Sequence, residues 1–155
     1  MKWLIRIGTH LVACGFGFAL GIYLLPILIA PEGPAAEDVQ SAARVSQFTA
    51  DVRRDLKDSD ALHWGEGELF VSAQSIAFQG RLAPGPDYRL YLSPKFVETE
   101  AEFQSLKSQM VEVGPVRTFE NFMVSVPASI DPTKFNAAIV WCESFGQFIT
   151  AAEYQ

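Results

Sequence analysis

The feature that most constrains this chain is an uncharged, strongly apolar run near its N-terminus, residues 11–30. A helix of about 20 apolar residues is long enough to cross the hydrocarbon core of a bilayer, which is ~30 Å thick. Lys2 and Arg6 precede the run, and Glu32, Glu37 and Asp38 follow it. The positive-inside rule therefore predicts a single membrane-spanning helix over residues 7–30, with a cytoplasmic N-terminus and the remaining chain in the periplasm or outside the cell.

Three alternatives to a plain spanning helix stay open. A cleaved signal peptide would have a shorter apolar region and a small-residue cleavage site, for which residues 34–36 (PAA) are the nearest candidate. Residues 11–14 (LVAC) match the lipobox of a bacterial lipoprotein, which would make Cys14 an acylated residue. Residues 17–21 form a GxxxG motif, which can pack two membrane helices together.

The charge of the rest of the chain limits its partners. Removing Lys2, Arg6 and Glu32 from the 12 basic and 18 acidic residues of the whole chain leaves 10 basic and 17 acidic residues after position 32. Nucleic-acid binding depends on Lys and Arg neutralising phosphates, so the composition predicts no nucleic-acid partner. The membrane is the expected partner of the N-terminal helix, and a protein partner is left open.

Residues 31–60 are expected to form a linker and an amphipathic helix. The segment begins with a Pro- and Gly-bearing break, and apolar residues then recur at spacings of three and four, at Val45, Phe48, Val52 and Leu56. This spacing predicts a short juxtamembrane helix over residues 37–56.

From residue 61 the pattern changes to short apolar runs separated by Gly, Pro and Asp. The expected strands cover residues 68–72, 74–79, 88–93, 110–113, 122–126, 137–141 and 148–152. Thr99 and Glu102 match a capping box and predict a short helix to about residue 109. Short strands at this spacing indicate an all-β, sandwich or barrel-like antiparallel domain. The expected division is residues 1–6, 7–30, 31–60 and 61–155.

The most apolar part of this domain is residues 135–148, FNAAIVWCESFGQF. Five successive apolar residues without helical spacing predict a central strand that is buried on both faces. Because successive strand side chains point to opposite faces, Ile139 and Trp141 should share one face, and Val140 and Cys142 the other.

Three segments of the domain occur in a suggestive order: residues 63–67 (HWGEG), 85–92 (GPDYRLYL) and 140–145 (VWCESF), followed by Ala151 and Ala152. Together they resemble the DM13 domain family over about residues 62–154. The resemblance implies a β-rich module outside the cytoplasm, similar in style to haem- or redox-linked DOMON domains. It also implies an electron-transfer or thiol-redox role around the family's cysteine, which corresponds here to Cys142.

The candidate site residues follow from this resemblance and from the residue types. Cys142 is the candidate redox thiol, although an inert core thiol is also consistent with its apolar neighbours. His63 and Trp141 are the candidate cofactor-binding residues. The cofactor is unknown. Haem is left open because His63, Met110, Met123 and Cys142 are all residue types that can ligate its iron. One cysteine and one histidine in the domain do not support a zinc or iron–sulfur site.

Two functional hypotheses remain, and the residues do not decide whether the protein is an enzyme. The first is a membrane-anchored domain outside the cytoplasm with a redox or electron-transfer role centred on Cys142. The second is a tethered binding or scaffolding module in which Cys142 only fills the core. Hydrolase motifs such as Gly-x-Ser-x-Gly and His-Glu-x-x-His are absent from the sequence.

Overall fold

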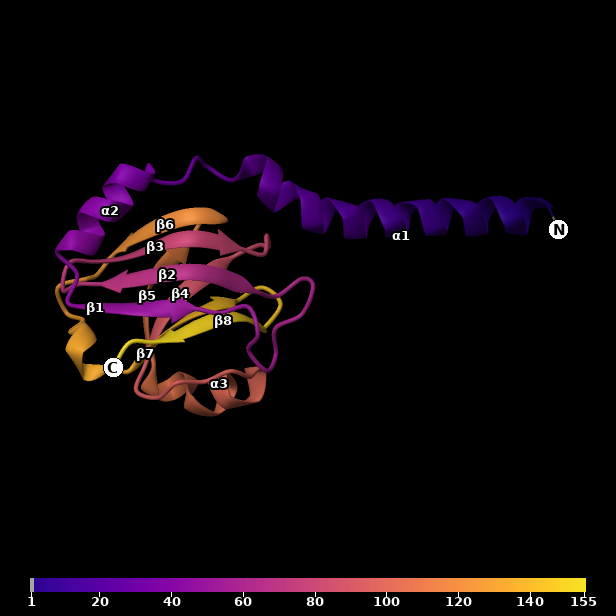
Figure 1. Ribbon diagram of the computed structural model, residues 1–155. Coiled ribbons are helices and arrows are strands. Elements are labelled where there is room, and N and C mark those ends of the chain that lie inside the picture. The colour runs from indigo at the N-terminus through magenta and orange to yellow at the C-terminus, as the bar shows by residue number, and fades with distance from the viewer. Residues whose placement is uncertain (1) are drawn as a thin grey trace.

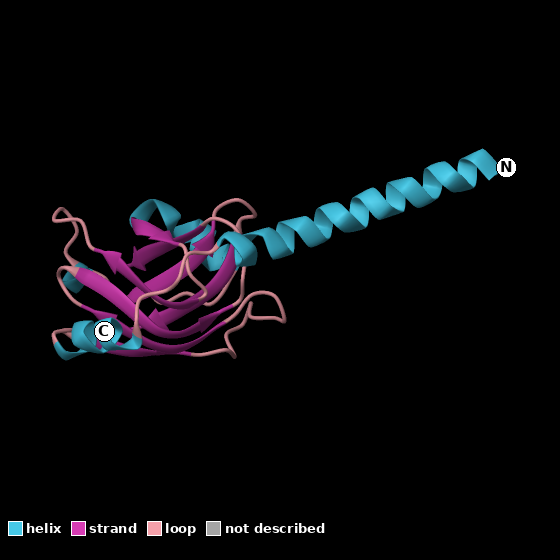
Figure 2. Ribbon diagram, turned by 90° about the horizontal axis from the view of Figure 1, so that it is seen from above, coloured by secondary structure: helices cyan, strands magenta, loops and turns pink. Residues whose placement is uncertain are grey.

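The computed structural model describes residues 2–155 and shows an antiparallel β-sandwich behind a long N-terminal helix (Figure 1). Helix α1 covers Lys2–Ile29 and contains Pro26, and none of its residues is buried. It is long and apolar enough to span a membrane. Most of α1 projects away from the sandwich, whereas its C-terminal end lies against it (Figures 1 and 2).

Eight strands in the described residues form two four-stranded antiparallel sheets. The first sheet has the order β1-β2-β3-β6, with strands Phe48–Val52, Gly65–Val71, Ser75–Leu82 and Glu120–Ser125. The second has the order β5-β4-β7-β8, with strands Val111–Val116, Tyr88–Ser93, Ala137–Cys142 and Gln147–Glu153. The predicted all-β sandwich is confirmed.

The main core lies between the two sheets and follows the alternation of the strands. Leu69 on β2, Phe78 on β3 and Leu90 on β4 all point into it, as the period-two patterns predicted. Phe78 and Phe122 stack there with ring centroids 5.0 Å apart. The sheets are therefore held together mainly by burial of apolar surface.

A helix covers the outer face of each sheet. Helix α2, Ala36–Arg44, packs Val39 against Phe70 and Ala77 of the first sheet. Helix α3, Glu100–Leu106, packs Phe103 on the second sheet and continues into the 3-10 turn η1, Lys107–Gln109. The Thr99 hydroxyl accepts the Glu102 backbone N–H at 3.2 Å, which confirms the predicted N-cap.

Strand β7 has the predicted central position, because it lies between β4 and β8 and all six of its residues are buried. Val140 and Cys142 face the core between the sheets. Ile139 and Trp141 face the outer layer under α3. The predicted division of side chains between the two faces is thus confirmed.

One local prediction is wrong. The amphipathic helix does not extend to residue 56, since α2 ends at Arg44 and Phe48–Val52 is strand β1. A spacing of four residues fits period two as well as a helical turn, and pairing with β2 decides in favour of the strand. In strand β4, Tyr91 and Ser93 are buried as well as the core-facing residues, and Tyr91 belongs to the outer cluster under α3.

The division of the chain into four parts stays a prediction. Strand β1 belongs to the first sheet although it precedes residue 61. A second 3-10 turn, η2, covers Pro132–Lys134, and its cap Asp131 accepts the Thr133 N–H, with Pro at the first position of the turn.

Candidate functional site

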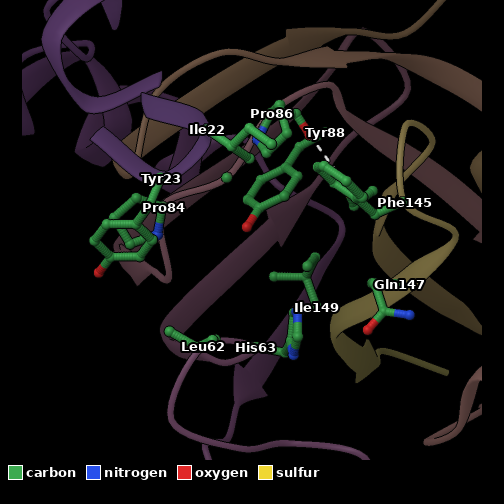
Figure 3. Close-up of a pocket in the computed structure, with 12 residues that line it drawn as sticks. Ile22, Tyr23, Leu62, His63, Pro84, Pro86, Tyr88, Phe145, Gln147 and Ile149 are labelled. Carbon is green, nitrogen blue, oxygen red and sulfur yellow. Dashed lines mark hydrogen bonds between the residues drawn. The ribbon is translucent and has the colours of Figure 1, made fainter. Parts of the chain in front are cut away.

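Cys142 lies at the C-terminal end of β7, where the strand meets the turn between β3 and β4. It pairs with Tyr88 across the sheet. Its Sγ donates a hydrogen bond to the carbonyl oxygen of Pro86 at 3.0 Å (dashed line in Figure 3). The Tyr88 hydroxyl donates to the Ala83 carbonyl at 2.9 Å, which fixes the other side of the same turn.

Gly85 is required in this turn for steric reasons. A Cβ at that position would lie 2.8 Å from Cε1 of the Tyr88 ring, closer than real side chains approach. The sequence 84–87 (PGPD) therefore folds tightly against Tyr88 and brings the Pro86 carbonyl to Cys142.

His63 reaches the site from the loop that precedes β2. The Asp60 carboxylate accepts the backbone N–H of His63 at 2.8 Å, and its other oxygen lies 3.0 Å from the His63 Nδ1. The Leu62 N–H also donates to Asp60, at 2.6 Å. A carboxylate bound to one imidazole nitrogen fixes the orientation of the ring, and Nε2 remains for a ligand.

His63 and Cys142 line one pocket of about 390 Å³. Its walls include Pro84, Pro86, Tyr88 and Ile149, together with Ile22 and Tyr23 of helix α1 (Figure 3). In this view Leu62 and His63 lie on one side of the pocket, and Pro84, Ile22 and Tyr23 on the other. The volume is within the range of small-molecule sites, about 300–1,000 Å³.

The other sequence candidates lie elsewhere. Trp141 is 1% exposed and points to the opposite face of the sheet, where it stacks on Phe103. Met110 packs against the same outer cluster, and Met123 is exposed on β6. Only Cys142 and His63 are brought together in the pocket. The residues that sequence reasoning missed are Asp60, Tyr88, Ile22 and Tyr23.

The surroundings of Cys142 favour its protonated form. Burial raises the pKa of the thiol, and Asp87 and Glu143 act in the same direction. The backbone N–H groups of Phe145 and Ser144 oppose this effect, but the net pKa lies above its ordinary value. A protonated thiol is what the hydrogen bond to Pro86 requires, and a thiolate nucleophile is disfavoured.

We expect Cys142 to alkylate slowly in the folded protein. At neutral pH, iodoacetamide should modify it at least about tenfold more slowly than a free thiol, because the residue is only 3% exposed and its burial raises the pKa of the thiol. Mass spectrometry of a Cys14→Ser protein isolates this one thiol. Unfolding with guanidinium should restore the rate, and a native rate equal to that of a free thiol would contradict the buried, protonated assignment.

The opposite face of the second sheet carries an ion-paired aromatic cluster. Lys107 Nζ lies 2.8 and 2.9 Å from the two Glu143 carboxylate oxygens, and the Tyr91 hydroxyl also donates to Glu143. Phe103 and Trp141 stack below, with ring centroids 3.9 Å apart and planes at 8°. This cluster fixes Glu143, the residue after Cys142, and thereby the end of β7.

The ion pair between Lys107 and Glu143 should make folding stability depend on pH. Burial opposes ionisation of this carboxyl, but the hydrogen bonds from Lys107 and Tyr91 outweigh it, so its pKa lies below the ordinary 4.5. Because the pKa of Glu143 is lower in the folded state, the stabilisation that its ionised form provides is present above pH ~4.5. It is lost as the pH falls through the folded pKa.

We therefore expect Glu143→Gln to lower the free energy of unfolding by about 1–2 kcal/mol at pH 7, given partial exposure of the pair. The difference from wild type should shrink below pH ~4. Chemical denaturation at several pH values measures it, with exposed Glu153→Gln as the control. A difference that stays constant down to pH 3 would exclude this pair as its source.

The pocket suits some redox groups and not others. Within residues 2–155 there is no group of three or more His, Cys, Asp and Glu side chains that could hold a bare metal ion. His63, with its ring oriented by Asp60, would be the residue that holds a haem iron or that hydrogen-bonds an organic redox group. Such a group, when bound, supplies reversible electron uptake.

Fold and site thus define a β-sandwich domain with an apolar pocket beside an N-terminal helix that is able to span a membrane. The family described as "Electron transfer DM13" matches residues 55–154, which is more than half of the chain. The chain belongs to the DM13 family. No curated protein and no solved structure matches it.

Proposed function

We propose that this protein is a membrane-anchored electron-transfer domain that works outside the cytoplasm, and that the pocket shared by His63 and Cys142 holds its redox-active ligand. The observation that carries the proposal is the meeting of these two residues, which are distant in the sequence, in one pocket with an oriented imidazole. The description of the family as electron-transfer domains supports the same conclusion.

In this proposal, residues 1–6 are cytoplasmic and residues 7–30 span the membrane. Residues 31–60 connect the membrane helix to the redox domain, most of which is formed by residues 61–155. The placement of Lys2 and Arg6 before the helix supports an outward-facing domain. No nucleic acid takes part, since the domain is acidic.

Each pocket residue has a defined role in the proposal. His63 binds the ligand through Nε2, and Asp60 positions the ring from Nδ1. Cys142 forms part of the pocket wall as a protonated thiol that is held by the Pro86 carbonyl. It contacts the ligand and does not itself exchange disulfides.

The burial of Cys142 favours a second candidate function, a tethered binding module without redox chemistry. Cys142 is only 3% exposed, and its thiol is satisfied by a backbone carbonyl. In that case Cys142→Ser would leave partner binding intact and change only stability, by about 1–3 kcal/mol, the usual range for a disturbed buried polar contact.

The test uses the full-length protein, purified from membranes in mild detergent. Native mass spectrometry and the absorbance spectrum report the bound ligand in wild type, His63→Ala and His10→Ala; these are the chain's two histidines, and His10 lies on exposed α1. We expect occupancy to fall at least about tenfold in His63→Ala and to stay unchanged in His10→Ala. A wild-type protein without any redox-active ligand would refute the proposal and leave the binding module.

A further inference from the structure

Ile22 and Tyr23 of helix α1 line one side of the pocket. Trp3 and Tyr23 are 20 residues apart on α1, which at 1.5 Å per residue is about 30 Å, the thickness of the hydrocarbon core. Trp and Tyr favour the two interfaces of a bilayer. Tyr23, which lines the pocket, therefore marks the outer interface.

The span over residues 7–30 places Tyr23 deeper than the interface. Tyr23 is then seven residues before Ala30 and lies about 10 Å inside the hydrocarbon boundary. Residues 22 and 23 contribute to the pocket in either case. In both registers, the two helix residues that line the pocket lie at or below the outer boundary of the hydrocarbon.

The rim of the pocket is suited to that environment. Leu62 and Phe145 are 55% and 53% exposed, although both are large and apolar, and both line the pocket. In Figure 3, Phe145 lies across the pocket from Tyr23, and Leu62 lies below it. Insertion of such side chains into the interface removes their apolar surface from water.

The interior of the pocket selects a neutral ligand. None of its twelve lining residues is Asp, Glu, Lys or Arg. Such a wall does not neutralise a phosphate or carboxylate, and burying an unpaired charge there would be costly. The rings of Tyr88, Tyr23 and Phe145 offer aromatic surface, and His63 and Gln147 offer polar atoms for one or two ligand oxygens.

We infer that the pocket binds a lipid-soluble quinone, which enters from the bilayer between α1 and the sandwich. The ring occupies the apolar space beside Tyr88, and its apolar tail stays in the membrane past Ile22. The Asp60-oriented imidazole of His63 accepts a hydrogen bond from a quinol hydroxyl through Nε2, or donates to a quinone carbonyl when it is protonated. This inference rests on the proposed function and names the class of its ligand.

Two experiments with full-length protein test it. Organic extraction of protein purified from membranes, followed by chromatography, identifies quinones that copurify. Titration of a benzoquinone with a ten-carbon saturated tail into protein in phosphatidylcholine vesicles, monitored by tryptophan fluorescence, measures affinity. The variants are His63→Ala, Ile22→Trp, which fills the mouth of the pocket, and Leu24→Trp, a matched control at an exposed position of α1 that does not line the pocket.

We expect binding near one quinone per chain. Affinity should fall about tenfold in His63→Ala, as expected for one lost hydrogen bond of this kind, and at least as much in Ile22→Trp, with Leu24→Trp unchanged. Three outcomes overturn the inference. In the first, another chromophore, such as haem, binds in a His63-dependent way and quinone does not bind; the quinone is then excluded, but the proposed function survives. If only phospholipid copurifies, or if neither ligand is found, the proposed function fails as well.

Discussion

Trp141→Ala should be among the most damaging single substitutions in this protein, lowering the free energy of unfolding by about 3–5 kcal/mol. Trp141 is 1% exposed and lies on β7, an interior strand of the second sheet between β4 and β8. Its ring stacks on Phe103 of α3, so truncation removes the contact that attaches this helix to the sheet. Chemical denaturation of the full-length protein in detergent measures the loss.

The control for this substitution is Phe145→Ala, four residues further along the chain. Phe145 is 53% exposed, so its truncation should cost less than about 1 kcal/mol. An equal effect of the two substitutions would mean that β7 is not the buried centre of the second sheet.

Gly80→Ala should also be strongly destabilising, by about 1–3 kcal/mol. Gly80 on β3 lies opposite Gly67 on β2. A Cβ at Gly80 would lie 2.6 Å from the Phe78 ring and 2.8 Å from the Gly67 Cα, and it would also collide with the Glu66 carbonyl oxygen. Because two of these neighbours are backbone atoms, the clash can be relieved only if β2 and β3 move apart.

Gly114→Ala provides the matched control for Gly80→Ala. Its added Cβ would meet only a side-chain methyl of Val124, at 3.1 Å, which can adjust. We expect a change below about 1 kcal/mol, and the two variants can be compared by thermal unfolding monitored with near-ultraviolet circular dichroism. Equal midpoints would contradict the close approach of β2 and β3.

The sequence predicts the strands well where side-chain alternation and turn chemistry agree. In β4, Tyr88, Leu90 and Leu92 alternate after a Pro-Gly-Pro-Asp turn, and the strand begins at Tyr88 as expected. The prediction is wrong for Phe48–Val52, because Phe48 and Val52 are four residues apart and fit a helix and a strand equally well. Only pairing with a distant strand resolves this ambiguity, and such pairing is not local information.

The candidate site shows the same limit. Cys142 and His63 could each be identified from residue type and family resemblance, but their common pocket depends on how β7 and the loop before β2 meet in space. Asp60 carried a detectable signal, since a carboxylate three residues before a histidine can bind both its backbone and its ring. Ile22 and Tyr23 carried almost none, because an apolar helix predicted to face lipid gives no sign of a pocket wall.

Potentiometric titration of the full-length protein, with its absorbance spectrum recorded at each potential, tests the central claim most directly. If the pocket of His63 and Cys142 holds a redox-active ligand, the wild-type protein and His10→Ala should show a reversible transition with the same midpoint. The transition should disappear or lose at least about tenfold in amplitude in His63→Ala. A wild-type protein with no transition, or a transition that His63→Ala leaves unchanged, would contradict the assignment of this pocket to electron transfer.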